Sequence, residues 1–342
     1  MKIYQLLKLF TSIRSPRVRL IGLWLMNRMG RRYVGVFLDP VIACNLRCRM
    51  CYFSGSKGRE MSKERMSLEH IDKISKSVFD KALKLQIGCG GEPSLYNNLL
   101  YIVEKAKEYR VPYISLTTNG NLLKKEDLRK LVIAGLNEIT ISVHGVQSET
   151  YEYFMQNANY GRFLALLKFL EELKKDYPNF KIRINYTINE DNLVDLKFFW
   201  TVFGGLKFDV LQLRPIQNIG DCMYENYNLD KLKKDFYIIS NLVEECRKRG
   251  ITTLAPTMEN LERVDDIEYE GNSLFEKITH CYVYPNGCND GDFDYENETI
   301  NQYHKRVGVW REVIQFIFLL RSNKKILRNT SLKCLIIGKK SA

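Results

Sequence analysis

The most informative segment of the sequence is Cys44-Asn-Leu-Arg-Cys48-Arg-Met-Cys51, a C-x3-C-x2-C run directly after a predicted strand at residues 33–41. Three thiols this close together can wrap one metal centre, and soft sulfur ligands favour zinc or an iron–sulfur cluster. A structural zinc site needs a fourth ligand, and the nearest histidine, His70, has no zinc-like spacing. The run therefore predicts a [4Fe–4S] cube with one open iron, and zinc or an inert cysteine group are the alternatives.

Outward from this run, short β-branched or aromatic segments alternate with longer amphipathic ones, which predicts βα units on a parallel sheet. Helices are expected near 68–84, 97–110, 125–134, 160–176, 193–203 and 230–249. Strands are expected at 33–41, 85–90, 112–118, 138–143, 180–188 and 208–215. Six such units predict an α/β fold, an incomplete (β/α)6 barrel rather than a closed eight, with chemistry at the loops that follow the strands.

The cysteine run and the strand pattern resemble the radical S-adenosylmethionine (radical SAM) superfamily over roughly residues 35–215. The resemblance implies that Cys44, Cys48 and Cys51 hold a [4Fe–4S] cluster whose open iron chelates S-adenosylmethionine. An electron from the cluster then cleaves the sulfonium C5′–S bond, and the 5′-deoxyadenosyl radical abstracts a substrate hydrogen atom. The family's usual aromatic residue before the third cysteine is Met50 here, which is not expected to disturb ligation.

Later strand ends fit the same resemblance. Gly90-Gly91-Glu92-Pro93 resembles the family's GGE motif, which binds the methionine amino group; glycine permits close backbone approach and a carboxylate accepts from an ammonium. Thr118-Asn119-Gly120 resembles a largely structural third-strand turn. Ser142 and Asn185 resemble residues that contact the cofactor's carboxylate or ribose. His144 stands at a strand end where it could exchange a proton with substrate, or simply be a hydrogen-bonded rim histidine.

After about residue 255 the alternation stops, and the sequence around Cys281 and Cys288 resembles a shortened SPASM or twitch extension. Intact extensions bind auxiliary clusters through several more cysteines, whereas only Cys281, Cys288 and the distant Cys334 are available here. Two interpretations of this region stay open: a degenerate, metal-free cap or a region that binds an auxiliary cluster. The resulting division is a basic amphipathic segment at 1–32, a core barrel at 33–255, and a C-terminal region with a basic tail at 256–342.

The positive charge is concentrated at the two ends: residues 1–32 carry +8 and residues 301–342 carry +9, whereas the residues between them carry −5, which gives the net charge of +12. Basic amphipathic ends of this kind lie on anionic membranes, wrap nucleic acid, or cover the barrel as solvated arms. RNA is not favoured, because no nucleic-acid module is recognisable. The start of the sequence has no clean apolar run before a cleavage site, and no stretch is long enough to span a bilayer, so a cytoplasmic protein, free or peripheral to the membrane, is expected.

The sequence therefore predicts an enzyme that cleaves S-adenosylmethionine with an electron from a donor such as flavodoxin or ferredoxin. Because the extension resembles that of peptide-modifying members, a peptide or protein substrate is favoured. A carbohydrate, a cofactor precursor or RNA are the alternatives within the same chemistry. The rival of another class is a non-catalytic iron–sulfur scaffold or sensor, which would have no use for Glu92, Ser142 and Asn185.

Overall fold

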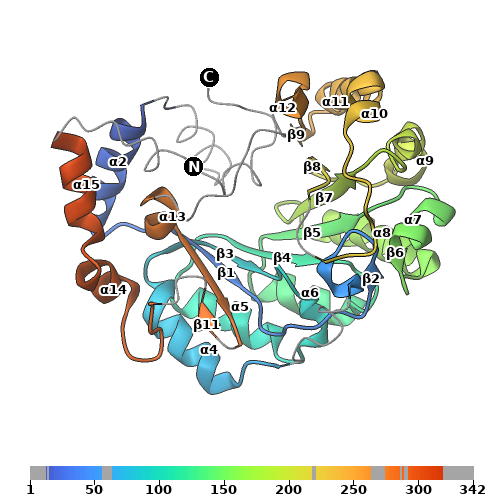
Figure 1. Ribbon diagram of the computed structural model, residues 1–342. Coiled ribbons are helices and arrows are strands. Elements are labelled where there is room, and N and C mark those ends of the chain that lie inside the picture. The colour runs from blue at the N-terminus through green and yellow to red at the C-terminus, as the bar shows by residue number, and fades with distance from the viewer. Residues whose placement is uncertain are drawn as a thin grey trace.

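A nine-stranded sheet organises the protein, as seen in a computed structural model (Figure 1). The structure describes residues 13, 15–55, 64–217, 221–262, 274–285, 287–288 and 292–318. The strand order is β11-β10-β1-β3-β4-β5-β7-β8-β9, and every pairing is parallel except that of β10 with β11. The strands are β1 (Val34–Leu38), β3 (Ala82–Ile87), β4 (Ile114–Thr118), β5 (Glu138–Val143), β7 (Lys181–Ile188), β8 (Val210–Pro215), β9 (Thr252–Leu254), β10 (His280–Tyr284) and β11 (Gly287–Cys288).

The sheet is an incomplete barrel, which confirms the predicted fold class. Its outermost members, β9 and β11, pair with only one neighbour each, so the sheet does not close. All six strands expected from the sequence are present as β1, β3, β4, β5, β7 and β8. Their carboxyl ends share one rim, and the loops that leave this rim carry the candidate site.

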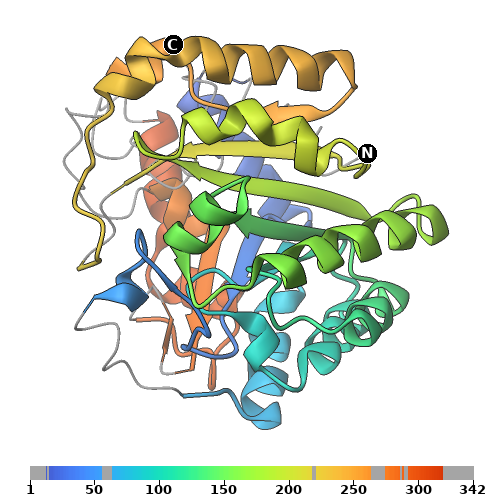
Figure 2. The same cartoon turned by 90° about the vertical axis from the view of Figure 1, so that its right-hand side faces the viewer.

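Helices lie outside the curved sheet (Figure 2). The longer ones are α2 (Pro16–Arg28), α5 (Leu99–Glu108), α6 (Lys125–Ala134), α8 (Tyr160–Asp176), α11 (Phe236–Lys248) and α15 (Val309–Phe318). The shorter ones are α4 (Leu68–Ile74), α7 (Ser148–Phe154), α9 (Phe199–Phe203), α10 (Asp230–Lys234), α12 (Met258–Glu262), α13 (Leu274–Thr279) and α14 (Ile300–Arg306). No helix in these described ranges has the length and apolar character needed to cross a bilayer.

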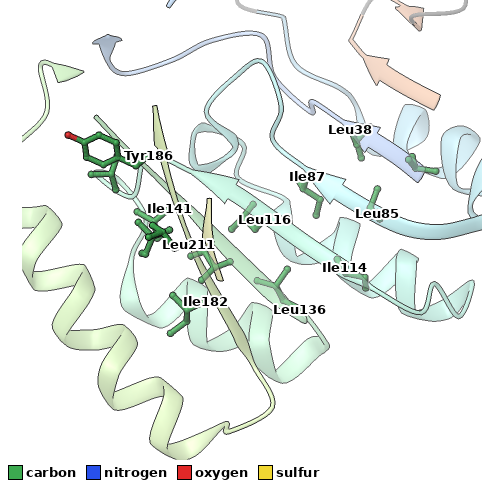
Figure 3. Packing of buried hydrophobic residues seen from close by; sticks show 14 of the residues in the cluster. Leu38, Leu85, Ile87, Ile114, Leu116, Leu136, Ile141, Ile182, Tyr186 and Leu211 are labelled. Carbon is green, nitrogen blue, oxygen red and sulfur yellow. The ribbon is translucent and has the colours of Figure 1, made fainter. Parts of the chain in front are cut away.

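The core lies between the sheet and its helices. Successive strand residues point to opposite faces, so one set packs outward against helices while the other lines the barrel interior. Figure 3 shows the outward set, with Leu38, Leu85, Leu116, Ile141 and Leu211 among its buried members. The alternate set is mostly polar, with Phe37 and Val210 among its apolar members.

The interior floor holds a buried ion pair. Arg183 on β7 lies 3.3 Å from Glu138 on β5, and the Tyr113 hydroxyl donates to the same carboxylate at 2.9 Å. Burial raises the pKa of Glu138 to about 7. The barrel interior is therefore built for polar contents.

The expected helix at 68–84 is too long. Helix α4 gives way to a π-helical turn at Ser75–Phe79, and β3 begins at Ala82. The segment around Lys81-Ala82-Leu83 contains good helix formers, but Ala82 pairs with Val34 of β1. Tertiary pairing thus overrides local propensity here.

The C-terminal region contributes to the same sheet. Strand β10 pairs in parallel with β1, with Gly35 opposite His280 and Leu38 opposite Val283. The boundary placed at residue 255 stays a prediction, but the segment beyond it supplies an edge of the barrel sheet.

Candidate active site

The three cysteines of the C-x3-C-x2-C run lie on one loop at the carboxyl end of β1. Cys48 belongs to β2 (Arg47–Cys48), which pairs antiparallel with β6 (Met155–Gln156). The Cys51 amide donates to the Cys48 carbonyl at 2.9 Å, and a 3-10 turn at Tyr52–Ser54 follows. Within this turn the Ser54 hydroxyl donates to the Cys51 carbonyl at 2.7 Å. The loop backbone is thus fixed by its own hydrogen bonds.

The three thiols are free and half-buried. Burial raises the pKa of Cys44 to about 11 and also raises the pKa of Cys48 and Cys51, with the neighbouring thiols adding to the shift at Cys48. Cys44 Sγ accepts from the Leu46 amide at 3.4 Å and from Asn119 Nδ2 at 3.8 Å. Metal binding here must therefore displace thiol protons, and N–H donors are in place to stabilise the thiolate.

These thiols suit a cluster better than a single ion. Within the described ranges, no three His, Cys, Asp or Glu side chains converge closely enough to hold one metal ion. A four-iron cube is wider than one ion, and its cysteines ligate different irons, so they need not meet at a point. Three thiols on one loop fit such a cluster and would leave its fourth iron without a cysteine ligand.

The two glycines of the GGE loop pack against the cysteine loop. A Cβ on Gly91 would lie 2.2 Å from the Val41 carbonyl oxygen, and a Cβ on Gly90 would lie 2.9 Å from Tyr52 Oη. The Glu92 amide donates to the Ala43 carbonyl at 2.8 Å. Gly91 is therefore needed for the close backbone approach between the two loops, whereas a Cβ on Gly90 would meet side-chain atoms.

Glu92 is 3% exposed and accepts hydrogen bonds from the chain at both carboxylate oxygens. Its Oε1 accepts from Ser94 N at 3.1 Å, Ser94 Oγ at 2.6 Å and Thr118 Oγ1 at 2.6 Å, while Oε2 accepts from Asn119 N at 2.8 Å. Burial raises the pKa of this carboxyl. Oε2 has a single donor and hence an acceptor position to spare. The role of Glu92 toward a methionine amino group stays a prediction, with Oε2 as its atom.

Asp39 and Tyr282 belong to this site, although neither was expected from the sequence. Asp39 is buried at the end of β1 and accepts from the amides of Cys89 and Gly90 at 2.7 Å and of Gly91 at 3.3 Å. The Tyr282 hydroxyl of β10 donates to Asp39 at 2.5 Å. The Tyr52 hydroxyl donates to the Gly90 carbonyl at 2.8 Å. The Asp39 carboxylate therefore links the GGE loop to strand β10.

The remaining predicted contacts line the barrel interior. Ser142 and Asn185 lie opposite each other on β5 and β7. In the described part of the chain, Asn185 Oδ1 and His144 Nδ1 are buried without hydrogen-bond partners. Burial, with a contribution from Arg214, lowers the pKa of His144 to about 4. Its imidazole is therefore neutral near pH 7, and the catalytic role stays a prediction.

The cysteines of the C-terminal region are arranged differently. Cys281 on β10 and Cys288 on β11 are buried, and Cys288 Sγ donates to the Phe293 carbonyl at 3.2 Å. Cys281 lies next to Tyr282 on β10, so its side chain points to the opposite face from Asp39. Cys334 lies outside the described residues. An auxiliary cluster at these cysteines stays an untested expectation.

Comparison with known proteins agrees with the motif. The family model of the radical SAM superfamily matches residues 40–195. A probable GTP 3′,8-cyclase of Saccharolobus islandicus (strain L.S.2.15 / Lassen #1) is 28% identical over 199 residues, 57% of this chain and 61% of the relative. One of Thermococcus kodakarensis is 24% identical over 233 residues, 67% of this chain and 70% of the relative. The chain thus spans less than two thirds of the first of these relatives.

Solved structures share the fold. SuiB of Streptococcus suis bound to S-adenosylmethionine has a TM-score of 0.57 at 16% identity, covering 80% of this chain and 65% of SuiB. The structure of anSMEcpe with bound AdoMet and a peptide has a TM-score of 0.51 at 19% identity, covering 65% and 63%. At these identities the likeness extends to the arrangement of strands and helices.

Proposed function

The chain belongs to the radical SAM superfamily, and we propose that it cleaves S-adenosylmethionine reductively at a [4Fe–4S] cluster held by Cys44, Cys48 and Cys51. The observation that carries this proposal is the packing of the cysteine loop against the GGE loop, with Asn119 joining them. The Asn119 side chain reaches Cys44 Sγ at 3.8 Å, while its amide donates to Glu92 at 2.8 Å. Asn119 therefore connects the cysteine loop to the loop that carries Glu92.

In this family the bound cluster supplies the electron that cleaves the sulfonium C5′–S bond and so yields the radical that abstracts a substrate hydrogen atom. The chain's own residues bind and orient. Gly90 and Gly91 bring backbone to the open side of the cysteine loop, and Glu92 Oε2 can accept from an ammonium. Ser142 and Asn185 face the interior from neighbouring strands, where they can take hydroxyl or carboxylate groups of the cofactor.

Two classes of substrate are proposed for this chemistry. A peptide or protein is favoured by the SPASM-like character of the C-terminal sequence, and one solved SuiB structure of the same fold is described as bound to a precursor peptide. A second candidate, a nucleotide-like cofactor precursor, is favoured by the sequence relatives named probable GTP 3′,8-cyclase. The polar interior around Arg183 and Glu138 is compatible with either.

The test uses anaerobically purified full-length protein reduced with dithionite or with flavodoxin and its reductase. We expect 5′-deoxyadenosine and methionine to form slowly without substrate, measured by liquid chromatography and mass spectrometry. Addition of GTP, or of a peptide library, identifies the substrate class by accelerating this release. Stoichiometric zinc in place of iron would refute the cluster. A cluster that neither binds nor cleaves S-adenosylmethionine would instead identify an iron–sulfur scaffold.

A further inference from the structure

Helix α2 exposes apolar side chains on the face that points away from the core. Val18, Ile21, Leu25 and Met29, here called the apolar stripe, are 50%, 37%, 46% and 65% exposed. Spacings of three and four residues place them on one side of the helix. Single exposed apolar residues are ordinary on protein surfaces, but a continuous stripe marks an interaction surface.

The opposite side of α2 fixes the helix in place. Leu20 and Leu23 are buried, and the helix begins with a Ser15 cap followed by proline. Helix α15 lies beside α2 (Figure 1) and buries Val309, Val313 and Phe316. The apolar stripe is thus presented by a helix anchored on its inner face.

Helix α15 extends the exposed apolar surface. Its Ile314 and Phe318 are 37% and 75% exposed, one helical turn apart. Arg311 precedes them on the same side of the helix by spacing.

The charged residues of α2 are all basic, whereas Glu312 lies on the adjoining α15 and Asp80 lies near the end of α2. Arg17 and Arg28 flank the apolar stripe, Arg31 follows it, and residues 1–32 contain no acid. In the described part of the chain none of these three arginines forms an ion pair, and Arg28 lies over the Trp24 ring at 5.5 Å. A helix with apolar residues at its outer face and arginines beside them matches the chemistry of a lipid–water interface.

We propose that the outer face of α2, with the adjoining end of α15, docks on an anionic phospholipid bilayer, with the apolar stripe in the interface and the arginines at headgroup phosphates. A second copy of this chain fits less well, because it would bring the same arginines together. The basic segments at residues 1–12 and 319–342 fit this face no better, because their positive charge would be repelled by the arginines beside the apolar stripe. Helix α2 and the cysteine-bearing β2 lie on opposite sides of Figure 1, so docking leaves the candidate active site uncovered.

The experiment is co-flotation of full-length protein with vesicles of phosphatidylcholine alone or with 30% phosphatidylglycerol. Wild type is expected to float with the anionic vesicles and to lose binding as salt rises. Ile21→Gln with Leu25→Gln should lower the partition coefficient about tenfold. A matched pair, Ile133→Gln with Leu164→Gln, removes exposed apolar residues from α6 and α8 and should leave it unchanged.

The charge contribution is measured separately. Each of Arg17→Gln and Arg28→Gln should lower partition to anionic vesicles about fivefold, because a basic residue near the headgroups contributes about 1 kcal/mol, which is about fivefold in a partition coefficient. Arg247→Gln with Lys248→Gln on α11 is the control for net charge. These positions are at the surface or near it, and cluster absorbance reports whether each variant stays folded.

Three outcomes would overturn the proposal. One is wild-type protein that does not float with anionic vesicles. Another is undiminished binding by the stripe variant, which would assign binding to the terminal segments. The third is a light-scattering dimer that the stripe variant dissociates while vesicle binding is absent, which would make the face a contact between copies.

Discussion

The two cysteine-bearing regions of the molecule differ in placement more than in composition. The first region holds three half-buried cysteines on one loop at the barrel rim, namely Cys44, Cys48 and Cys51. The Leu46 amide and the Asn119 side chain both donate to Cys44 Sγ. Cys281 and Cys288 are buried in two paired strands, and the thiol of Cys288 is bonded to a backbone carbonyl. The comparison shows that the first region gathers half-buried thiols on one loop, as ligation requires, whereas Cys281 and Cys288 lie buried in a strand pair, where an auxiliary cluster stays a prediction.

The largest expected effect tests this contrast directly. Replacing Cys44, Cys48 and Cys51 together with alanine should abolish the iron, about four atoms per chain in wild type if only this cluster is present. Cys281→Ser with Cys288→Ser should leave that iron in place. Iron and sulfide assays with electron paramagnetic resonance measure both. Loss of about half of a larger iron content in the second variant would instead reveal an auxiliary cluster.

A smaller effect is expected at the carboxylate beside the first region. Glu92→Ala should weaken S-adenosylmethionine binding by about 1.5–3 kcal/mol if a charge-assisted hydrogen bond is lost, with iron near normal. Because Glu92 also accepts four hydrogen bonds from the chain, Glu92→Gln is the milder companion variant. The measurement is the change in the reduced-cluster resonance on titration. Equal affinity in wild type and both variants would remove Glu92 from the cofactor site.

Strand β10 should influence the site through the hydroxyl of Tyr282 rather than through the thiol of Cys281. Tyr282→Phe removes one donor to Asp39, and we expect cofactor affinity to fall by about 0.5–1.5 kcal/mol. Tyr284→Phe on the same strand is the matched control, because the Tyr284 hydroxyl makes no hydrogen bond among the described residues. Identical effects of the two variants would show that β10 acts only by filling space.

The smallest effect at neutral pH concerns two buried histidines. Burial lowers the pKa of His144, in the site, and of His304, in the C-terminal region, to about 4 from 6.5. Since the folded state favours the neutral imidazole, the stability that each contributes is complete above pH 6.5 and is lost as pH falls toward 4. Either histidine replaced by glutamine should remove up to about 3 kcal/mol from the pH dependence of the unfolding free energy over that range.

The two histidines should differ near pH 7. His304 has hydrogen-bond partners on both ring nitrogens, the Tyr33 hydroxyl at 3.3 Å and the Lys277 carbonyl at 3.1 Å, whereas His144 Nδ1 has none. Loss of His304 should therefore cost more stability at neutral pH. Denaturant melts between pH 4 and 7 measure this, and unchanged pH profiles would contradict the burial of either imidazole.

Most of the barrel could be predicted because its signals are local. Alternating apolar residues indicate each strand, and the close spacing of Cys44, Cys48 and Cys51 indicates one metal centre. Glu92 could be singled out because it follows two glycines at a strand end. The helix expected at 68–84 shows the limit of such signals, because Ala82 lies in a strand paired with β1 although alanine favours helix.

The sequence by itself determined the family, the parallel strands and the three cysteines, because each is encoded within a few neighbouring residues. Only the tertiary structure decided that β10 pairs with β1, and that Asp39 and Tyr282, 243 residues apart, share one hydrogen bond. It also decided which side of α2 faces outward. Contacts of this kind depend on which distant strands and helices become neighbours, and no local pattern of residues carries that information.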